Sequence, residues 1–215
     1  MNEKFFDLKK EKQDRMINAS LKIFANAGYT HASTDDIVRE AGISKGLLFH
    51  YFTSKLGLYT FLYDYAAKYE QLELSTCIGR EETDYFVLLG QIVRAQAECM
   101  KSYPYLILFL DRAGSEEDEA AAEATGAQIA AHAEQIRAIL ARADISAFRP
   151  GTDIRMIDRL LTGAFRSLLA ESLRLEEGYA AAYEEACMPY LDMMRRFCTM
   201  SDTDMPVMGP AVDNM

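Results

Sequence analysis

Residues 33–55 read STDDIVREAGISKGLLFHYFTSK, and this stretch decides the fold of the N-terminal part of the chain. Ser33 or Thr34 can cap a helix by accepting a hydrogen bond from a free backbone N–H group, and the two aspartates that follow suit the positive end of that helix. Gly42 can take the left-handed conformation that ends a helix and turns the chain. Ser44 is a cap for a second helix. The stretch therefore predicts two short helices joined by a tight turn.

Two helices joined in this way form a helix-turn-helix, whose second helix enters the major groove of DNA. Here the second helix is expected to run from Lys45 to about Tyr51. The preceding segment, 9–27, carries apolar residues on one helical face and is expected to end at Gly28. Its apolar face would pack against the helix-turn-helix, so the sequence predicts a three-helix head.

The head resembles the N-terminal DNA-binding domain of TetR-family transcriptional regulators. The resemblance covers roughly residues 10–60 and rests on a set of spaced positions: Thr34, Ile37, the run Ala41–Gly46, the aromatic run Phe49–Phe52, and Lys55. It implies an all-α fold, in which the DNA-binding head is followed by a helical ligand-binding and dimerisation domain.

The resemblance also implies which residues approach DNA: Thr34, Ser44, Lys45, Gly46, Phe49, His50, Tyr51 and Lys55. Hydroxyl groups and the amides of helix N-termini can hold phosphate oxygens, and the two lysines add positive charge. Base readout is expected from Lys45 and, through a thymine methyl group, from Leu48 or Phe49. Phe49 stands where the family commonly has a tyrosine, and the hydroxyl group of Tyr51 can substitute for the one it lacks.

Charge is distributed unevenly along the chain. The whole protein of 215 residues has a formal net charge of −10, which looks unsuited to DNA. Residues 1–55, however, hold 9 Lys and Arg against 7 Asp and Glu, whereas the remainder holds 14 against 26. A mildly basic head can meet phosphates while an acidic body is repelled from the duplex.

The domain boundaries are predicted from helical periodicity and from turn residues. We expect a head over 1–55, a helical body over 56–200 and a flexible tail over 201–215. After a fourth helix that runs from Lys55 to about Leu74, the body is expected to hold helices near 82–102, 104–113, 117–143, 152–175 and 179–199. Pro104 is placed in the first turn of its helix and Thr152 is placed as a cap.

Dimerisation is implied by the resemblance. The helices at about 152–175 and 179–199 would pair with their copies in a second chain as a four-helix bundle. Both carry apolar stripes, and Gly163 with Ala164 permits close helix approach. Pro189 lies inside the last helix and is expected to kink it.

A ligand cavity in the body is predicted from residue types alone. Aromatic, sulfur-containing and imidazole side chains suit apolar or flat ligands, and the helices of the body can bring the following together: Cys99, Met100, Tyr103, Phe109, His132 and Phe165. A packed core explains these residues equally well. The charge of the ligand stays open: Glu98, Asp111, Glu134 and Glu171 suit a cation, whereas Arg94 and Arg166 suit an anion.

The sequence thus predicts a repressor that binds a palindromic DNA operator as a homodimer and is released by a small-molecule inducer. A structural DNA-binding protein without such a switch is the alternative, and activation instead of repression stays open. A helical enzyme is disfavoured, because the three histidines are scattered and no metal-binding His pair or glycine-rich phosphate loop occurs. We expect no cofactor and no metal. The four cysteines have no zinc-type or disulfide-rich spacing, and no window approaches twenty apolar residues, so a cytoplasmic location without a membrane partner is expected.

Overall fold

The computed structural model describes residues 3–200, and the predicted tail at 201–215 lies outside this range. The described residues form a helical protein, as the sequence predicts, with a single isolated β-bridge between Phe148 and Thr199. No helix in this part of the chain is long and apolar enough to cross a membrane. The elements are η1 (Glu3–Asp7), α1 (Lys10–His31), α2 (Thr34–Ala41), α3 (Lys45–Phe52), α4 (Lys55–Cys77), α5 (Tyr85–Ser102), α6 (Leu106–Ala113), α7 (Glu119–Leu140), η2 (Ile145–Ala147), α8 (Ile154–Ser172) and α9 (Tyr179–Cys198).

The head has the predicted helix-turn-helix, and its boundaries are set by caps. The hydroxyl of Ser33 accepts from the backbone N–H groups at the start of α2, and Gly42 ends α2 with φ of 63°. The hydroxyl of Ser44 accepts from the backbone N–H of Leu47 at 3.2 Å and starts α3. Helix α1 runs past the predicted end, because the chain resumes helical bonding after a break at Gly28, where φ is 70°.

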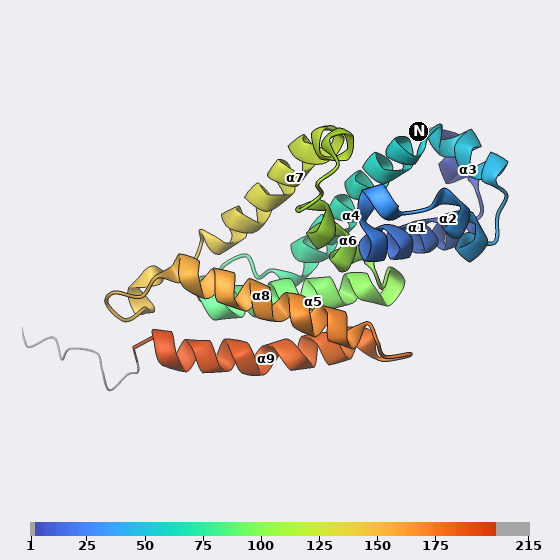
Figure 1. Ribbon diagram of the computed structural model, residues 1–215. Coiled ribbons are helices and arrows are strands. Elements are labelled where there is room, and N and C mark those ends of the chain that lie inside the picture. The colour runs from blue at the N-terminus through green and yellow to red at the C-terminus, as the bar shows by residue number, and fades with distance from the viewer. Residues whose placement is uncertain (1–2, 201–215) are drawn as a thin grey trace, which may run out of the picture.

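The body forms a layered arrangement next to the head (Figure 1). Helix α5 packs against α4 on one side and α9 on the other, and α8 packs along α9. Helix α7 packs mainly on α4 and leans away from the α8–α9 pair in Figure 1.

The head and the body share one hydrophobic core. The ring of Tyr59 on α4 contacts Phe24 of α1 and Phe109 of α6, with ring centroids 5.1 and 5.4 Å apart. All three rings are almost wholly buried. Since α4 begins at Lys55 and enters this core within its first two turns, the same helix packs in both the head and the body.

Two local predictions in the body were wrong, and a third stays untested. Asp153, not Thr152, caps α8, because its carboxylate accepts from two backbone N–H groups in the first turn of that helix. Pro104 lies in the turn before α6, which starts at Leu106. Helix α9 is one continuous element through Pro189, and the kink expected there stays a prediction. That proline is on the exposed side of the helix, where water can satisfy the carbonyl that loses its N–H donor.

Candidate DNA interface and ligand cavity

The start of α3 is the accessible part of the helix-turn-helix. Ser44, Lys45 and Gly46 are exposed there. His50 is exposed in the last turn of α3, whereas Thr34 and Phe49 are half-buried. The ammonium group of Lys45 lies 2.9 Å from a carboxylate oxygen of Asp35 on α2. This pair is exposed, so the lysine can exchange its partner for a base edge or a phosphate at little cost.

The other side of α3 belongs to the core. Leu48 is almost wholly buried, and the expectation that it contacts a thymine methyl is therefore wrong. Tyr51 is also buried, and its ring lies edge-on to Phe5 with centroids 5.7 Å apart. Its role at DNA stays a prediction that rests on the hydroxyl group at the end of the ring.

The N-terminal 3-10 helix η1 is a part of the head that the sequence reasoning missed. Phe5 is fully buried and contacts Phe52 at the end of α3 and Phe61 on α4, with centroids 5.1 and 5.4 Å apart. It therefore holds the recognition helix against α4. The signal was present in the sequence as two successive phenylalanines in an otherwise charged segment.

Lys55 links the start of α4 to the end of α1. Its ammonium group donates to the carbonyl of Thr30 at 3.3 Å and lies 4.5 Å from the centre of the Tyr29 ring. Burial against these groups lowers the pKa of Lys55 from its ordinary value. The lysine is thus held at the edge of the head, and a phosphate contact would replace its bond to the carbonyl.

The turn between α3 and α4 is strained, which the sequence reasoning also missed. Thr53 has φ of 65°, and the backbone N–H of Ser54 donates to the carbonyl of Phe52 at 2.6 Å across it. A Cβ atom on Gly57 would lie 2.3 Å from that same carbonyl oxygen, so a glycine is required there. This turn fixes the angle between α3 and α4.

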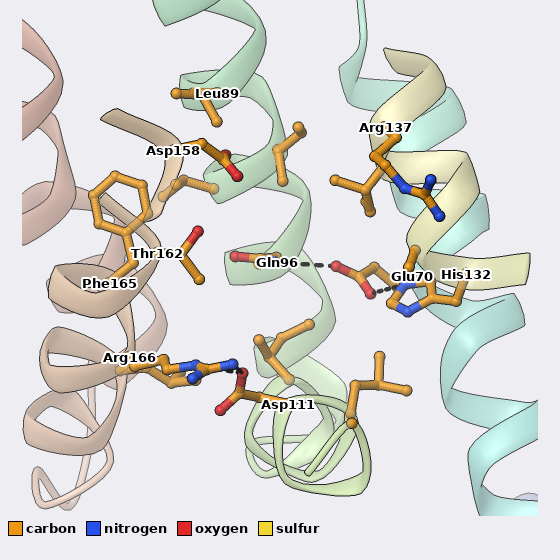
Figure 2. Close-up of a pocket in the computed structure, with 18 of the residues that line it drawn as sticks. Glu70, Leu89, Gln96, Asp111, His132, Arg137, Asp158, Thr162, Phe165 and Arg166 are labelled. Atoms are coloured by element: carbon orange, nitrogen blue, oxygen red, sulfur yellow. Dashed lines mark hydrogen bonds and ion pairs between the residues drawn. The ribbon is translucent and has the colours of Figure 1, made fainter. Parts of the chain in front are cut away.

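A cavity of about 430 Å³ lies among the helices of the body (Figure 2). Side chains from α4 to α9 line it, and its volume falls in the range of about 300–1,000 Å³ that is usual for small-molecule sites. The walls are mostly aliphatic, with Leu89, Ile92, Ile107, Leu110, Ile136 and Leu140 among them.

The predicted ligand residues divide between this cavity and the core. His132 and Phe165 line the cavity, on α7 and α8 respectively. Cys99 and Met100 are fully buried in the core and are not part of the wall. Phe109 lies in the aromatic contact between head and body described above.

Tyr103, the remaining predicted ligand residue, lies at the junction of head and body. Its hydroxyl donates to a carboxylate oxygen of Asp14 on α1 at 2.6 Å and accepts from Lys10 at 2.9 Å. The hydroxyl of Tyr65 on α4 lies 2.6 Å away. Tyr103 therefore connects α1 to α4 rather than facing the cavity.

The main polar group of the cavity is Glu70, which the sequence reasoning missed. Its carboxylate accepts from the amide nitrogen of Gln96 at 3.2 Å, and its other oxygen lies 2.8 Å from Nε2 of His132 (Figure 2). The hydroxyl of Tyr183 donates to the amide oxygen of Gln96 at 2.8 Å. The signal was a glutamate four residues after Ala66, on the buried stripe of α4.

The other charged residues near the cavity are paired at its rim or on the surface. The guanidinium of Arg166 lies 2.6 Å from the carboxylate of Asp111, and that of Arg137 lies 2.9 Å from Glu134. Asp158 lines the wall formed by α8, and burial raises the pKa of its carboxyl group.

The remaining charged residues considered from the sequence take no part in the wall. Glu98 pairs with Lys101 and Arg94 pairs with Glu184, while Glu171 accepts from the hydroxyl of Ser167.

An exposed apolar face runs along α8 and α9. Large apolar side chains at helical spacing leave much of their surface in water: Met156, Leu160, Tyr190, Met193 and Phe197. The exposed fraction is 60% for Leu160 and 71% for Phe197. Gly163 adds a position without a side chain on α8, with open space above it. Such a face is typical of a surface that a second chain covers.

Residues 16–60 match the sequence model of the bacterial regulatory proteins of the tetR family. The chain is similar to an uncharacterized HTH-type transcriptional regulator, YuxN of Bacillus subtilis, with 41% identity over 56 residues, which are 26% of this chain and 19% of that protein.

The likeness in three dimensions extends over almost the whole chain. A TetR family transcriptional regulator from Chloroflexus aurantiacus has a TM-score of 0.63 at 21% identity and covers 93% of this chain and 99% of its own. The regulator FadR of Bacillus subtilis, in complex with stearoyl-CoA, has a TM-score of 0.53 at 14% identity, over 82% of this chain and 96% of its own. Both are described as transcriptional regulators, and at these identities the likeness shows that they share the fold of this chain.

Proposed function

This chain belongs to the tetR family of bacterial regulatory proteins, and from that premise we propose that it is a transcriptional repressor whose DNA binding is controlled by a small molecule. In this proposal two copies bind a palindromic operator, and they leave it when a ligand enters the cavity. The head over 1–55 serves the DNA and the body over 56–200 serves the ligand and the partner chain. Such a protein acts on the chromosome, in the cytoplasm.

The observation that carries the proposal is the exposed first turn of α3. Ser44, Lys45 and Gly46 present a hydroxyl, an ammonium group and free backbone amides at one helix start. These groups can donate to phosphates and base edges in the major groove. Because the rest of α3 is packed against η1 and α4, the helix is held rigidly enough to dock as a unit.

The exposed face of α8 and α9 supports the homodimer. A helix-turn-helix dimer places its recognition helices about 34 Å apart, so that both reach the same side of the duplex. Covering Leu160 and Phe197 with a second chain would remove large apolar surface from water and hold the two heads at a fixed separation.

The position of α4 supports control by a ligand. Tyr63 and Glu70 bring α4 into the cavity wall, and the same helix begins at Lys55, directly after the recognition helix. A ligand that shifts α4 changes the separation of the two heads. Such a ligand weakens operator binding only to the extent that it binds the shifted state more tightly than the unshifted one. The coupling free energy between two such sites is typically about 1–3 kcal/mol.

The proposal is tested by binding the purified protein to the DNA upstream of its own gene and to scrambled DNA, across a series of salt concentrations. We expect saturable, sequence-selective binding by two chains per site, and release of the selective complex by a compound that fills the cavity. Because the FadR structure contains stearoyl-CoA, an acyl-CoA is one compound to include. Equal binding to both DNAs would contradict the proposal.

A structural DNA-binding protein without a switch is the alternative function. The cavity disfavours it, because a body that serves only for dimerisation has no need of an unfilled interior. Selective binding that no cavity-filling compound weakens would support this alternative, and increased transcription upon binding would indicate an activator.

A further inference from the structure

The buried carboxylate of Glu70 is the least solvated charged group in the cavity. Its side chain is 2% exposed, although charged residues are almost never fully buried unless they are paired. Within residues 3–200, the only group capable of positive charge that pairs with it is the imidazole of His132. No Lys or Arg of the described chain forms an ion pair with it.

The groups around Glu70 are arranged to hold a negative charge. Burial raises the pKa of Tyr183, so its hydroxyl stays protonated and donates to the amide oxygen of Gln96. That bond fixes the amide so that its NH₂ group points at Glu70. An ionised carboxylate can accept about four hydrogen bonds, and Gln96 and His132 account for two. The carboxylate therefore retains the capacity to accept from a ligand.

The basic residues of the cavity are placed differently. The side chains of Arg137 and Arg166 are 69% and 58% exposed, and each is already paired with a carboxylate. In Figure 2 the pair of Arg166 and Asp111 lies apart from the Glu70 group, across the cavity. An anion would therefore meet paired arginines at the rim, whereas a cation would meet an accepting carboxylate inside.

Asp158 adds a second carboxylate on the wall formed by α8, facing the α4–α7 side in Figure 2. Aliphatic side chains from α5, α6 and α7 line the space between these two walls. The cavity thus combines an apolar interior with acidic groups on two walls.

From this arrangement we infer that the ligand is an amphiphilic cation. It has an apolar body and one positively charged group, and that group is held at Glu70. The alkyl or aromatic body occupies the aliphatic part of the cavity. The cationic group contacts the carboxylate of Glu70, which already contacts His132. This inference rests on the proposed ligand control of DNA binding, whose site it specifies.

The test compares three probes with ten-carbon chains: decylammonium, decanoate and 1-decanol. Binding to the purified full-length protein is measured by calorimetry without DNA, below the micelle concentration of each probe. We expect decylammonium, whose N–H groups can donate to Glu70, to bind at least tenfold tighter than either of the others. Tighter binding of decanoate would overturn the inference, and so would equal binding or no binding of the three.

Two matched variants locate the charge. Glu70→Gln keeps the shape of the side chain and its ability to bond with Gln96, and it should abolish the tenfold preference while 1-decanol binding is retained. Glu134→Gln removes the same charge from the exposed side of α7 and should keep the preference. A preference that persists in Glu70→Gln would overturn the assignment.

The outcome is distinguishable from a failure of the proposed function. If decylammonium binds at Glu70 but does not release the protein from DNA, the ligand class stands and the switch fails. If an anionic compound releases the protein from DNA and the cation does not bind, the switch stands and the inference fails.

Discussion

The head and the cavity are assembled in different ways. The first turn of α3 takes its geometry from residues within a few positions, namely the cap at Ser44 and the left-handed Gly42. The polar group of the cavity takes its geometry from distant elements, since Tyr183 bonds to Gln96, 87 positions earlier in the chain. A local arrangement can be shared between otherwise different proteins, and the family model accordingly matches residues 16–60, whereas two proteins of the same fold are 21% and 14% identical to this chain.

The comparison raises the question of whether the locally built head can act without the body. The change Leu160→Asp on α8 should abolish selective operator binding although it is remote from α3. Burying an unpaired charge in the expected dimer interface costs about 3–5 kcal/mol, and each dimer would bury two. The dissociation constant of the dimer, from sedimentation equilibrium, and operator binding are the measurements.

Leu72→Asp is the matched control, because Leu72 is equally exposed but lies on α4, away from the α8–α9 face. It should leave both dimer and operator binding intact. If Leu160→Asp remained dimeric, the pairing of α8 and α9 would be wrong, and the head would be independent of this face.

The second prediction asks whether the head is complete within residues 16–60. Phe5 lies outside that range but fills the space between α3 and α4. Phe5→Ala should lower the free energy of unfolding by about 3–5 kcal/mol, as is usual for a buried phenylalanine, and weaken operator binding through disorder of α3. Urea denaturation followed by circular dichroism measures the loss.

Phe6→Ala is its control, since the neighbouring ring is half in solvent. A loss of less than about 1 kcal/mol is expected there, because a truncation at an exposed site leaves little cavity. Equal losses for the two variants would show that η1 is not packed on the head as the structure has it.

Sequence reasoning succeeded where a residue acts through its near neighbours. The caps at Ser33 and Ser44, the turn at Gly42 and the all-α fold were all predicted, because capping and helical periodicity depend on positions within one or two turns. The same reasoning placed Leu48 at the DNA. Which face of so short a helix is buried depends on η1 and α4, and no local signal fixes that.

The cavity shows the opposite case. His132 and Phe165 were predicted to line it and do, whereas Cys99 and Met100 belong to the core. Residue type alone cannot separate a wall from a core, because both are apolar and helical. Glu70 was overlooked although it interrupts an apolar stripe, and such an interruption gains meaning only when a partner on another helix is known.

The third prediction compares two lysines of the head. Lys55→Ala should weaken binding to all DNA sequences by roughly tenfold, about 1.4 kcal/mol, and reduce the slope of log affinity against log salt by about one unit for each phosphate that the variant no longer neutralises. Lys45→Ala should instead relax discrimination at particular base pairs. Both are measured by fluorescence anisotropy on operator variants at several salt concentrations.

The two results are independent. An unchanged salt slope in Lys55→Ala would mean that its interactions with Thr30 and Tyr29 are purely structural. Uniform weakening across all operator variants in Lys45→Ala would remove it from base readout.

The smallest expected effect concerns the connection between the two regions. The change Tyr103→Phe removes the hydroxyl that joins Asp14 on α1 to Tyr65 on α4, while the ring stays packed. Because Asp14 remains partly in solvent, we expect little loss of stability and nearly unchanged operator affinity. The release of DNA by a cavity ligand should weaken, by about 0.5–1 kcal/mol of coupling, since movement of α4 would reach α1 through one route fewer.

Tyr69→Phe is the control, because that ring packs on Tyr103 but takes no part in these bonds. The measurement is operator affinity with and without saturating ligand. If coupling is the same in both variants, the shared core of Phe24, Tyr59 and Phe109 carries the movement alone, and head and body are joined by packing rather than by hydrogen bonds.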